Sequence, residues 1–428
     1  MKIPVWPDFT GYRNIELGLS RVYELLARLN NPQNKIPPTI HLAGTNGKGS
    51  TLSFLRTIFS ESGLKVHTYT SPHLVNFNER ITLAGAEISD NFLEQCLLEC
   101  KKAAEKSPAI QVTFFEGITV AAFLAFSRVK ADVLLLETGL GGRLDATNIL
   151  PKVLCSIITP IAFDHTDFLG NTLGKIAFEK AGIIKENCPV IIGRQKISPL
   201  KILKNQALER SASATIFGED WKIKKMKNEF LFAGLGKKFL LPLPSLAGNH
   251  QIENASVAIA AALTQKKFKI SENQIKSALG KTFWPARLQK IESGKFFAML
   301  PKNCHLYLDG SHNLQGSETI KKFLKAQKNK KIFIIFSMLK DKDCAGFLKK
   351  IGAHVSHLEA LTIPDEPKSR SGQEILEIAK KLQINSEKSE NFNQAFKKIS
   401  ALQKDDEKSI VLVCGSLYLA GSFLDNLI

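Results

Sequence analysis

The stretch HLAGTNGKGST, residues 41–51, decides the fold because it joins an apolar run to an amphipathic run through three glycines. The first run, TIHLAG at 39–44, is typical of a buried strand, and the second, STLSFLRTIFSESG at 50–63, predicts a helix. Exposed backbone N–H groups at such a strand-to-helix turn act with the helix dipole to favour a bound phosphate. The stretch therefore predicts a phosphate-binding loop. The apolar face of the helix would consist of Leu52, Leu55, Ile58 and Phe59, and Gly63 would end it.

The spacing of this loop departs from the common phosphate loop, which has four residues between its first glycine and its Gly-Lys pair. Here two residues separate Gly44 from Gly47, and Gly49 separates Lys48 from Ser50. A purely structural turn is the alternative, and the predicted strand and helix on either side favour phosphate. Lys48 would then reach the β and γ phosphate oxygens, and Ser50 or the following threonine would order the phosphate or its Mg²⁺.

Six further apolar runs recur along the chain with helical patterns between them. Their hydrophobicity is continuous rather than alternating, which is typical of strands buried on both faces of a parallel sheet flanked by helices. The predicted fold class is therefore α/β with mostly parallel sheets. The runs are residues 132–139, 153–161, 189–193, 305–310, 331–339 and 409–416.

The length of 428 residues predicts two or three domains. A seam is expected near residues 289–297, where a polar stretch with glycine follows WPARL before the strand pattern restarts. We therefore predict one domain over residues 1–294 and another over 295–428. Within the first, residues 211–245 alternate apolar and polar positions between turn signals, which predicts a small antiparallel insertion.

Composition and charge narrow the function classes. With 44% hydrophobic and 23% charged residues, the chain is expected to be globular, and no apolar run is long enough to span a bilayer. The first residues lack a signal-peptide core, so we expect a cytoplasmic protein without membrane partners. The seven cysteines show no CxxC spacing, which argues against a disulfide framework or a zinc site.

The net charge of +18 fits nucleic acid, anionic small substrates or a lysine-rich solvated surface. The lysines are spread along the chain and are densest at residues 319–331, where they alternate with apolar residues as on the wet face of a helix. Without an arginine-rich tail or an aromatic-basic RNA motif, we expect no nucleic-acid partner. A nucleic-acid-stimulated ATPase stays open as the alternative from another class.

Polar side chains follow several of the predicted strands. Glu137 ends one run, Asp164 and His165 follow the next, and Ser71 follows HTYT. In an open parallel sheet, ligands bind beyond the carboxyl ends of the strands, and a buried carboxylate there is unfavourable unless it binds something. Mg²⁺ is the natural candidate because it takes oxygen ligands and bridges ATP phosphates. Taken singly, each residue also fits a structural role.

Eight motifs, in order along the whole chain, resemble the folylpolyglutamate synthase and dihydrofolate synthase family of Mur-ligase-like, ATP-dependent amide ligases. The irregular glycine loop is this family's own form. The motifs are GTNGKGS (44–50), SPHLVNFNERI (71–81), ETGLGGRLDATN (137–148), DHTDFLGNTLGKIAFEKAGIIK (164–185), GNHQIENASVAIAA (248–261), WPARL (284–288), LDGSHN (308–313) and GSLYLAG (415–421).

The resemblance implies a P-loop-type N-terminal ATPase domain and a smaller Rossmann-like α/β C-terminal domain. Mg-ATP would drive the joining of L-glutamate to a carboxylate of dihydropteroate or of a folate, through an acyl phosphate. Within the class, the alternatives are a monofunctional folylpolyglutamate synthase and a Mur-type peptide ligase. SPHL and GGRLDATN favour a dihydropteroate-using member. ATP, dihydropteroate, folates and L-glutamate are the expected partners of a monomer.

The resemblance also implies the site residues, position by position. For ATP they are Gly47, Lys48, Gly49, Ser50, Asn254, Arg287 and Asp309. Ser71 and Glu137 resemble ligands of one Mg²⁺ and His165 a ligand of a second, while Lys180 matches a lysine that the family carbamylates. Lys48, Lys180 and His312 are the expected catalytic residues. For the pterin substrate they are Glu16, Leu17, Gly18 and Leu19; Thr113, Phe114, Phe115 and Glu116; and Leu144, Asp145 and Ala146.

Overall fold

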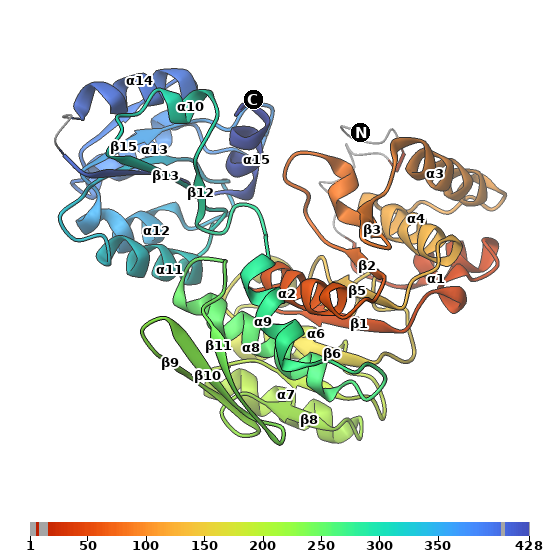
Figure 1. Ribbon diagram of the computed structural model, residues 1–428. Helices are drawn as coiled ribbons and strands as arrows, with labels where there is room; N and C mark the ends of the chain where they lie inside the picture. The colour runs from red at the N-terminus through yellow and green to blue at the C-terminus, as the bar shows by residue number, and fades with distance from the viewer. Residues whose placement is uncertain (1–5, 8–15, 404–406, 428) are drawn as a thin grey trace. The chain divides into compact units, whose positions relative to one another are not determined.

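The computed structural model describes residues 6–7, 16–403 and 407–427 (Figure 1). The chain divides into two compact units, the first comprising residues 1–245 and 251–283 and the second residues 246–250 and 284–428. Residues 284–294, which the sequence analysis placed in the first domain, thus group with the second unit by their contacts. The domain limits at residues 294 and 295 stay a prediction.

An eight-stranded sheet forms the centre of the first unit (Figure 1). Five neighbouring pairs, from β2–β5 to β7–β8, are parallel, and the two pairs at one edge, β2–β3 and β3–β4, are antiparallel. The predicted α/β class is confirmed. In sheet order the strands are β4 (Ala86–Glu87), β3 (Ile81–Leu83), β2 (Val66–Tyr69), β5 (Val133–Glu137), β1 (Thr39–Ala43), β6 (Cys155–Ile158), β7 (Val190–Ile192) and β8 (Ala214–Ile216).

Helices surround this sheet, and their ends follow local signals in the sequence. Thr113 caps the helix α4 by accepting from the Glu116 N–H, while the Glu116 carboxylate accepts from the Thr113 N–H. Those in the first unit are α1 (Ser20–Arg28), α2 (Lys48–Glu61), α3 (Asp90–Glu105), α4 (Phe114–Arg128), α5 (Thr166–Leu169), α6 (Leu173–Ala181), α7 (Ile197–Glu209), α8 (Asn249–Thr264) and α9 (Glu272–Lys281), with 3₁₀ turns η2 (Pro32–Lys35) and η3 (Phe77–Arg80).

The helix predicted after the glycine loop is α2. It begins at Lys48, after Gly47 in a left-handed conformation, and its four predicted apolar residues are fully buried. Gly63, with a φ of +81°, follows its last turn as expected. The predicted antiparallel insertion, residues 211–245, is also present as a three-stranded sheet. The strand β8, which lies near the beginning of these residues, belongs to the eight-stranded sheet and not to the insertion. The strands of the insertion are β9 (Trp221–Lys225), β10 (Glu229–Gly234) and β11 (Lys237–Pro242).

The second unit contains a six-stranded sheet in which only β12 is antiparallel to its neighbour. In sheet order the strands are β12 (Gln289–Ile291), β13 (Cys304–Leu308), β17 (Ser409–Cys414), β14 (Lys331–Phe336), β15 (His357–Ala360) and β16 (Ser386–Lys388). Its helices are α10 (Lys295–Ala298), α11 (Leu314–Lys325), α12 (Cys344–Ile351), α13 (Gly372–Lys381), α14 (Phe392–Leu402) and α15 (Leu417–Asp425), with the 3₁₀ turn η4 (Gly352–His354).

The register of the first sheet places the candidate site. Leu42 of β1 lies opposite Glu137 of β5, and Ala43 lies opposite Ile158 of β6. Because these strands are parallel, the segments that follow them leave the sheet at one edge. The glycine loop, Glu137 and the residues after β6 therefore share that edge.

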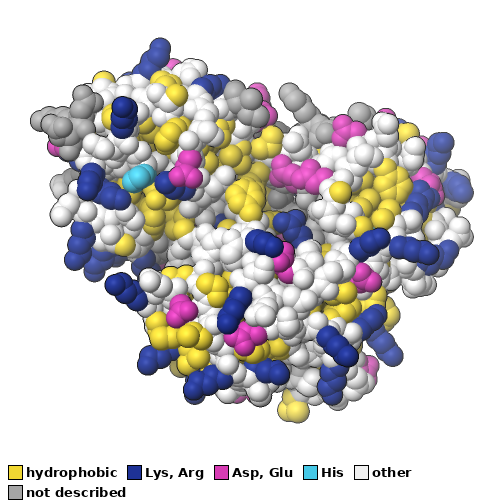
Figure 2. All heavy atoms as spheres, viewed as in Figure 1, with side chains coloured by type: hydrophobic (Ala, Val, Ile, Leu, Met, Phe, Trp, Pro, Cys, Tyr) yellow, Lys and Arg dark blue, Asp and Glu magenta, His cyan; other side chains and the backbone are white. Residues whose placement is uncertain are grey.

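Lys and Arg side chains are spread over the visible face of both units (Figure 2). The lysine-rich residues 319–331 lie partly on α11, which ends at Lys325. No helix within the described residues has the length and apolar character needed to cross a membrane.

Candidate active site

The glycine loop is packed too closely to accept larger residues. A Cβ atom on Gly44 would lie 1.8 Å from the Oγ1 atom of Thr159, and one on Gly47 would lie 2.5 Å from the Oδ1 atom of Asn254. The N–H groups of Thr45 and Asn46 both donate to the Pro160 carbonyl, at 3.1 and 3.3 Å. The loop is thus fixed against the segment that follows β6, with α2 starting directly behind it.

Two lysines converge on the carbonyl oxygen of Gly44. The Nζ atom of Lys180 donates to it at 2.9 Å and the Nζ atom of Lys48 at 3.2 Å. The carboxylate of Glu137 lies 3.7 Å from the Lys48 ammonium. The structure therefore brings together three predicted site residues from α2, β5 and α6.

Burial of Lys180 makes its charge unfavourable. Only 5% of its surface is exposed, and this burial, together with the nearby charge of Lys48, lowers the pKa of Lys180 to about 7. The carboxylates of Asp164 and Asp145 act in the opposite direction with smaller effect. Near neutral pH a large fraction of this amine is therefore unprotonated, whereas an ordinary lysine is almost entirely charged.

Among the strand-end residues, Ser71 and Glu137 offer side-chain oxygens to a cation, and His165 offers a ring nitrogen. Glu137, at the end of β5, is 4% exposed, and Ser71 follows β2. His165 has a φ of +50° at the start of α5, and its N–H donates to the Asp164 carboxylate at 3.0 Å. Within the described residues, no three His, Cys, Asp or Glu side chains form a closed metal cage. Ser71 and Glu137 fit Mg²⁺, because this ion takes one or two protein oxygens and completes its shell with water and phosphate.

Asn254 lies against the glycine loop and is held there by Gln251, which was not among the predicted site residues. The Nδ2 atom of Asn254 donates to the Oε1 atom of Gln251, one turn earlier on α8, at 2.9 Å. Gln251 is fully buried. Gln251 stands three residues before Asn254 in the motif GNHQIENASV, and this spacing places the two side chains next to each other on a helix.

The three predicted substrate segments meet in the first unit. Arg21 donates to the carboxylates of Glu16 at 2.8 Å and Glu116 at 3.1 Å, which joins residues 16–19 to the start of α4. A Cβ atom on Gly139 would lie 2.4 Å from the ring of Phe115, so α4 also contacts the 137–148 loop. Phe115 keeps some exposure and lies 6.2 Å from Tyr69, measured between ring centres. By contrast, Phe114 is buried in the core, so Phe115 is the more accessible of the two rings.

Asp145 lies below the surface, and its carboxylate organises its own loop. Oδ1 accepts from the N–H and hydroxyl of Thr147, and Oδ2 accepts from the Leu140 N–H at 2.7 Å. Burial raises the pKa of Asp145, and these hydrogen bonds act in the opposite direction with smaller effect. Leu144 is partly exposed and Ala146 is buried. Asp145 therefore orders the 139–147 backbone, on which the substrate segment depends.

His41 on β1 supports the same loop and was also missed. Burial, with a smaller effect of the Lys185 charge, lowers the pKa of His41 to about 3, so the ring is neutral. Its Nε2 atom lies 2.9 Å from the Thr147 hydroxyl, whose own proton goes to Asp145. His41 must therefore donate from Nε2. Because His41 precedes Thr147 by 106 residues, nothing in the local pattern indicates this contact.

The remaining predicted residues lie in the second unit. The Asp309 carboxylate accepts from the N–H groups of Leu288 at 2.8 Å and Ser311 at 2.8 Å, which fixes the turn that carries Arg287. The Nδ1 atom of His312 donates to the Gly310 carbonyl at 2.9 Å, which fixes the orientation of the ring. These residues form one cluster at the carboxyl end of β13.

Comparison with known proteins identifies the chain. Residues 42–262 match the family described as Mur ligase middle domain, and residues 292–426 match dihydrofolate synthetase, C-terminal domain. The dihydrofolate synthase/folylpolyglutamate synthase of Bacillus subtilis (strain 168) is 35% identical over 421 residues, covering 94% of this chain and 93% of the relative. The chain belongs to the dihydrofolate synthase/folylpolyglutamate synthase family. The folylpolyglutamate synthase of Lacticaseibacillus casei is 30% identical, covering 95% of this chain and 94% of the relative.

Solved structures of the family show the same fold. The structure of E. coli FolC in complex with DHPP and ADP has a TM-score of 0.86 and 31% identity, and the match covers 96% of this chain and 93% of that one. The structure of a bifunctional folylpolyglutamate synthase/dihydrofolate synthase with Mn, AMPPNP and L-glutamate bound has a TM-score of 0.84 and 29% identity, and the match covers 96% of this chain and 94% of that one. The predicted family, fold and enzyme class, an ATP-dependent carboxylate-amine ligase, are confirmed.

The two left-handed glycines that flank α2 provide a matched test of the loop. Gly47→Ala adds a methyl group 2.5 Å from the Asn254 amide, whereas Gly63→Ala adds one with nothing within 4 Å. Both substitutions introduce similar backbone strain. We expect Gly47→Ala to weaken AMPPNP binding by ~10-fold or more and Gly63→Ala to leave it within ~2-fold, measured by isothermal titration calorimetry. Equal affinities in the two variants would separate the loop from nucleotide binding.

Proposed function

We propose that this chain joins L-glutamate to dihydropteroate, to folates or to both, using ATP and an acyl-phosphate intermediate. The observation that carries the proposal is the convergence of Lys48, Lys180 and Glu137 on the glycine loop. The relatives of the chain are named dihydrofolate synthase/folylpolyglutamate synthase and folylpolyglutamate synthase. A carboxylate is a poor acylating agent, so it must be activated before an amine can attack it. Phosphoryl transfer from ATP supplies that activation.

The glycine loop would hold the transferring phosphoryl group. Gly47, Gly49 and Ser50 offer N–H groups at the start of α2, and the Lys48 ammonium would neutralise charge on the phosphate oxygens. Asn254 is positioned beside Gly47 to contact the nucleotide. From the second unit, we assign Arg287 and Asp309 to ATP and His312 to the reaction centre.

Divalent cations would be held by Ser71 and Glu137 at one position and by His165 at another. Mg²⁺ neutralises the phosphate oxygens and stabilises charge on the transferring group. Two ions are part of the proposal, and the positions of Glu137 at the end of β5 and of His165 before α5 support it.

The reaction then proceeds in two displacements. A carboxylate oxygen of the pterin substrate attacks the γ phosphorus, the bond to the bridging oxygen breaks, and ADP leaves. The neutral amine of L-glutamate next attacks the acyl carbon, phosphate departs with its electron pair, and the amine loses a proton. The protein contributes mainly position and fixed charge. Arg21, through Glu16 and Glu116, and Asp145, through its loop, would shape the substrate side.

Lys180 is proposed to react with CO₂ and form a carbamate. The neutral amine is the nucleophile, and the low pKa of about 7 makes it available at neutral pH. The ammonium loses one proton to give the neutral amine. Addition of CO₂ and loss of a second proton would then give a carbamate anion in place of a buried cation, beside the Lys48 ammonium. Such an anion would help to hold metal near the transferring phosphoryl group.

The positive charge of the chain is proposed to serve anionic small substrates. ATP, folates and L-glutamate are all anions, and a net charge of +18 favours their capture. We propose a monomer that acts in the cytoplasm without nucleic-acid partners. Dihydropteroate use is favoured by the meeting of the three substrate segments, and the monofunctional folylpolyglutamate synthase is the second candidate because of the Lacticaseibacillus casei relative.

Product analysis tests the proposed reaction. With Mg-ATP, L-glutamate and either dihydropteroate or tetrahydrofolate, mass spectrometry should find products heavier by one or more glutamyl groups. Glu137→Gln should lower turnover ~100-fold or more because it removes charge at the metal and Lys48, while exposed Glu99→Gln should not. Product from tetrahydrofolate alone would indicate the monofunctional enzyme. ATP hydrolysis that responds to DNA or RNA but not to pterin and glutamate would refute the proposal.

Substitutions of Lys180 test the carbamate. Lys180→Arg keeps the positive charge but cannot form a carbamate, so we expect turnover to fall on the order of 100-fold, as in Lys180→Ala. Lys175→Arg, on the exposed face of the same helix, should be close to wild type. Addition of a small carboxylate such as formate should restore some activity to Lys180→Ala. An active Lys180→Arg enzyme would leave Lys180 as an ordinary cation.

A further inference from the structure

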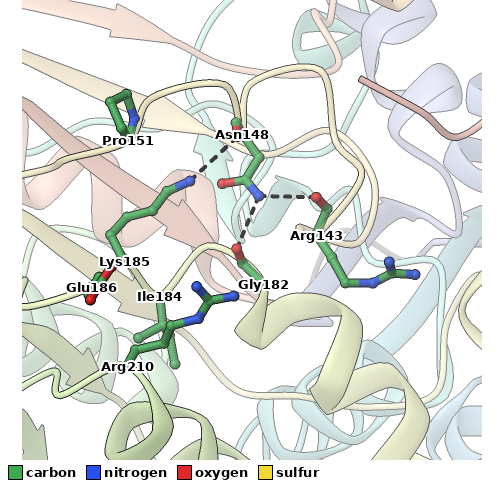
Figure 3. Close-up of a pocket in the computed structure, with 8 residues that line it drawn as sticks. All are labelled: Arg143, Asn148, Pro151, Gly182, Ile184, Lys185, Glu186 and Arg210. Carbon is green, nitrogen blue, oxygen red and sulfur yellow. Dashed lines mark hydrogen bonds between the residues drawn. The ribbon is translucent and has the colours of Figure 1, made fainter. Parts of the chain in front are cut away.

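A polar cavity lies in the first unit, and no residue of the glycine loop lines it (Figure 3). Its volume is about 300 Å³, and its wall includes Asn148, Lys185, Glu186 and Arg210. Asn148 precedes β6, and Lys185 and Glu186 precede β7, so this wall lies at the amino ends of those strands. The glycine loop follows the carboxyl end of β1, which is parallel to both. This part of the wall thus lies toward the opposite end of the strands from the glycine loop, while Arg143 and Gly182, which also line the cavity, lie where the 139–147 loop meets the end of α6.

Two basic groups of this cavity have no counterion among the residues that the structure describes. Among the described residues, neither Lys185 nor Arg210 forms an ion pair, and the Lys185 ammonium donates only to the Asn148 carbonyl at 3.4 Å. Burial lowers the pKa of Lys185 to about 8, and the charge of Arg210 adds to this effect. Arg143 also lines the cavity, but its guanidinium pairs with Glu179 at 3.0 Å and points away from Lys185 in Figure 3. The local field therefore favours an anion.

Asn148 adds a buried acceptor that lacks a donor. Its Nδ2 atom donates to the carbonyls of Arg143 at 3.1 Å and Gly182 at 3.0 Å, which fixes the orientation of the amide. The Oδ1 atom is consequently turned away from both carbonyls, toward the side on which Lys185 lies (Figure 3). Asn148 is 7% exposed, and Oδ1 has no hydrogen-bond partner. A buried acceptor of this kind requires a donor from a ligand or from water.

We propose that this cavity binds inorganic hydrogen phosphate. The anionic oxygens would accept from Lys185 and Arg210, and the P–O–H group would donate to the Oδ1 atom of Asn148. Hydrogen phosphate carries both features, whereas sulfate near neutral pH has no proton to donate. Glu186 lines the same cavity with a carboxylate and weakens binding of the anion. The proposal does not rest on the proposed ligase reaction, because Lys185, Glu186 and Arg210 have no part in that reaction.

Equilibrium dialysis of radiolabelled phosphate against the full chain tests this site. Saturating AMPPNP and Mg²⁺ fill the nucleotide site, so phosphate bound at the glycine loop does not count. We expect one phosphate per chain under these conditions, and at least tenfold weaker competition by sulfate than by unlabelled phosphate. Phosphate that does not bind to the AMPPNP-saturated wild-type chain would overturn the proposal. Sulfate competing equally well would remove the role of Asn148 as acceptor.

Charge-matched variants assign the binding to the cavity. Lys185→Met with Arg210→Met should weaken phosphate binding at least tenfold, whereas Lys201→Met with Lys204→Met, on neighbouring α7, removes the same charge and should change it less than twofold. Equal losses in the two double variants would refute a specific site. Glu186→Gln gives an independent test that does not depend on the folding of the first variant. It should strengthen binding severalfold, and an unchanged or weaker affinity would contradict the proposal.

Discussion

The Gly44 carbonyl is the acceptor on which the candidate site depends, because Lys180 and Lys48 both donate to it. One lysine comes from α6 and the other from the first turn of α2, so this one oxygen fixes two helices relative to β1. Placing two ammonium groups so close is unfavourable, and the buried Lys180 responds by a lowered pKa. The Lys48 ammonium that remains at the glycine loop supports the proposal that the loop binds phosphate oxygens.

Close backbone packing joins the phosphate side of the site to the substrate side. A Cβ atom on Gly142 would lie 2.8 Å from the Glu179 carbonyl, and one on Gly182 would lie 2.3 Å from the Cα atom of Arg143. The Arg143 N–H also donates to the Glu179 carbonyl at 2.7 Å. The loop that carries Asp145 therefore rests directly on the end of α6, close in sequence to Lys180. A shift of either element would move both halves of the site.

Local patterns in the sequence were sufficient for much of the fold. Continuous apolar runs predicted the central strands, and glycine with apolar periodicity predicted α2 and its end at Gly63. Contacts over long separations were not predictable, because partners such as His41 and Thr147 share no periodic pattern. The burial of Phe114 beside the more exposed Phe115 likewise depends on how α4 packs. For Asp145 the resemblance gave a substrate role, whereas the hydrogen bonds show how its carboxylate orders the loop.

The central claim is that ATP activates a substrate carboxylate by phosphorylating it. The most direct measurement uses dihydropteroate labelled with ¹⁸O in its carboxyl group, with mass analysis of the phosphate released during ligation. If an acyl phosphate forms, one oxygen passes from the carboxylate to phosphate, and the released phosphate carries one ¹⁸O atom per turnover. Released phosphate without ¹⁸O, formed together with the glutamylated product, would contradict the account.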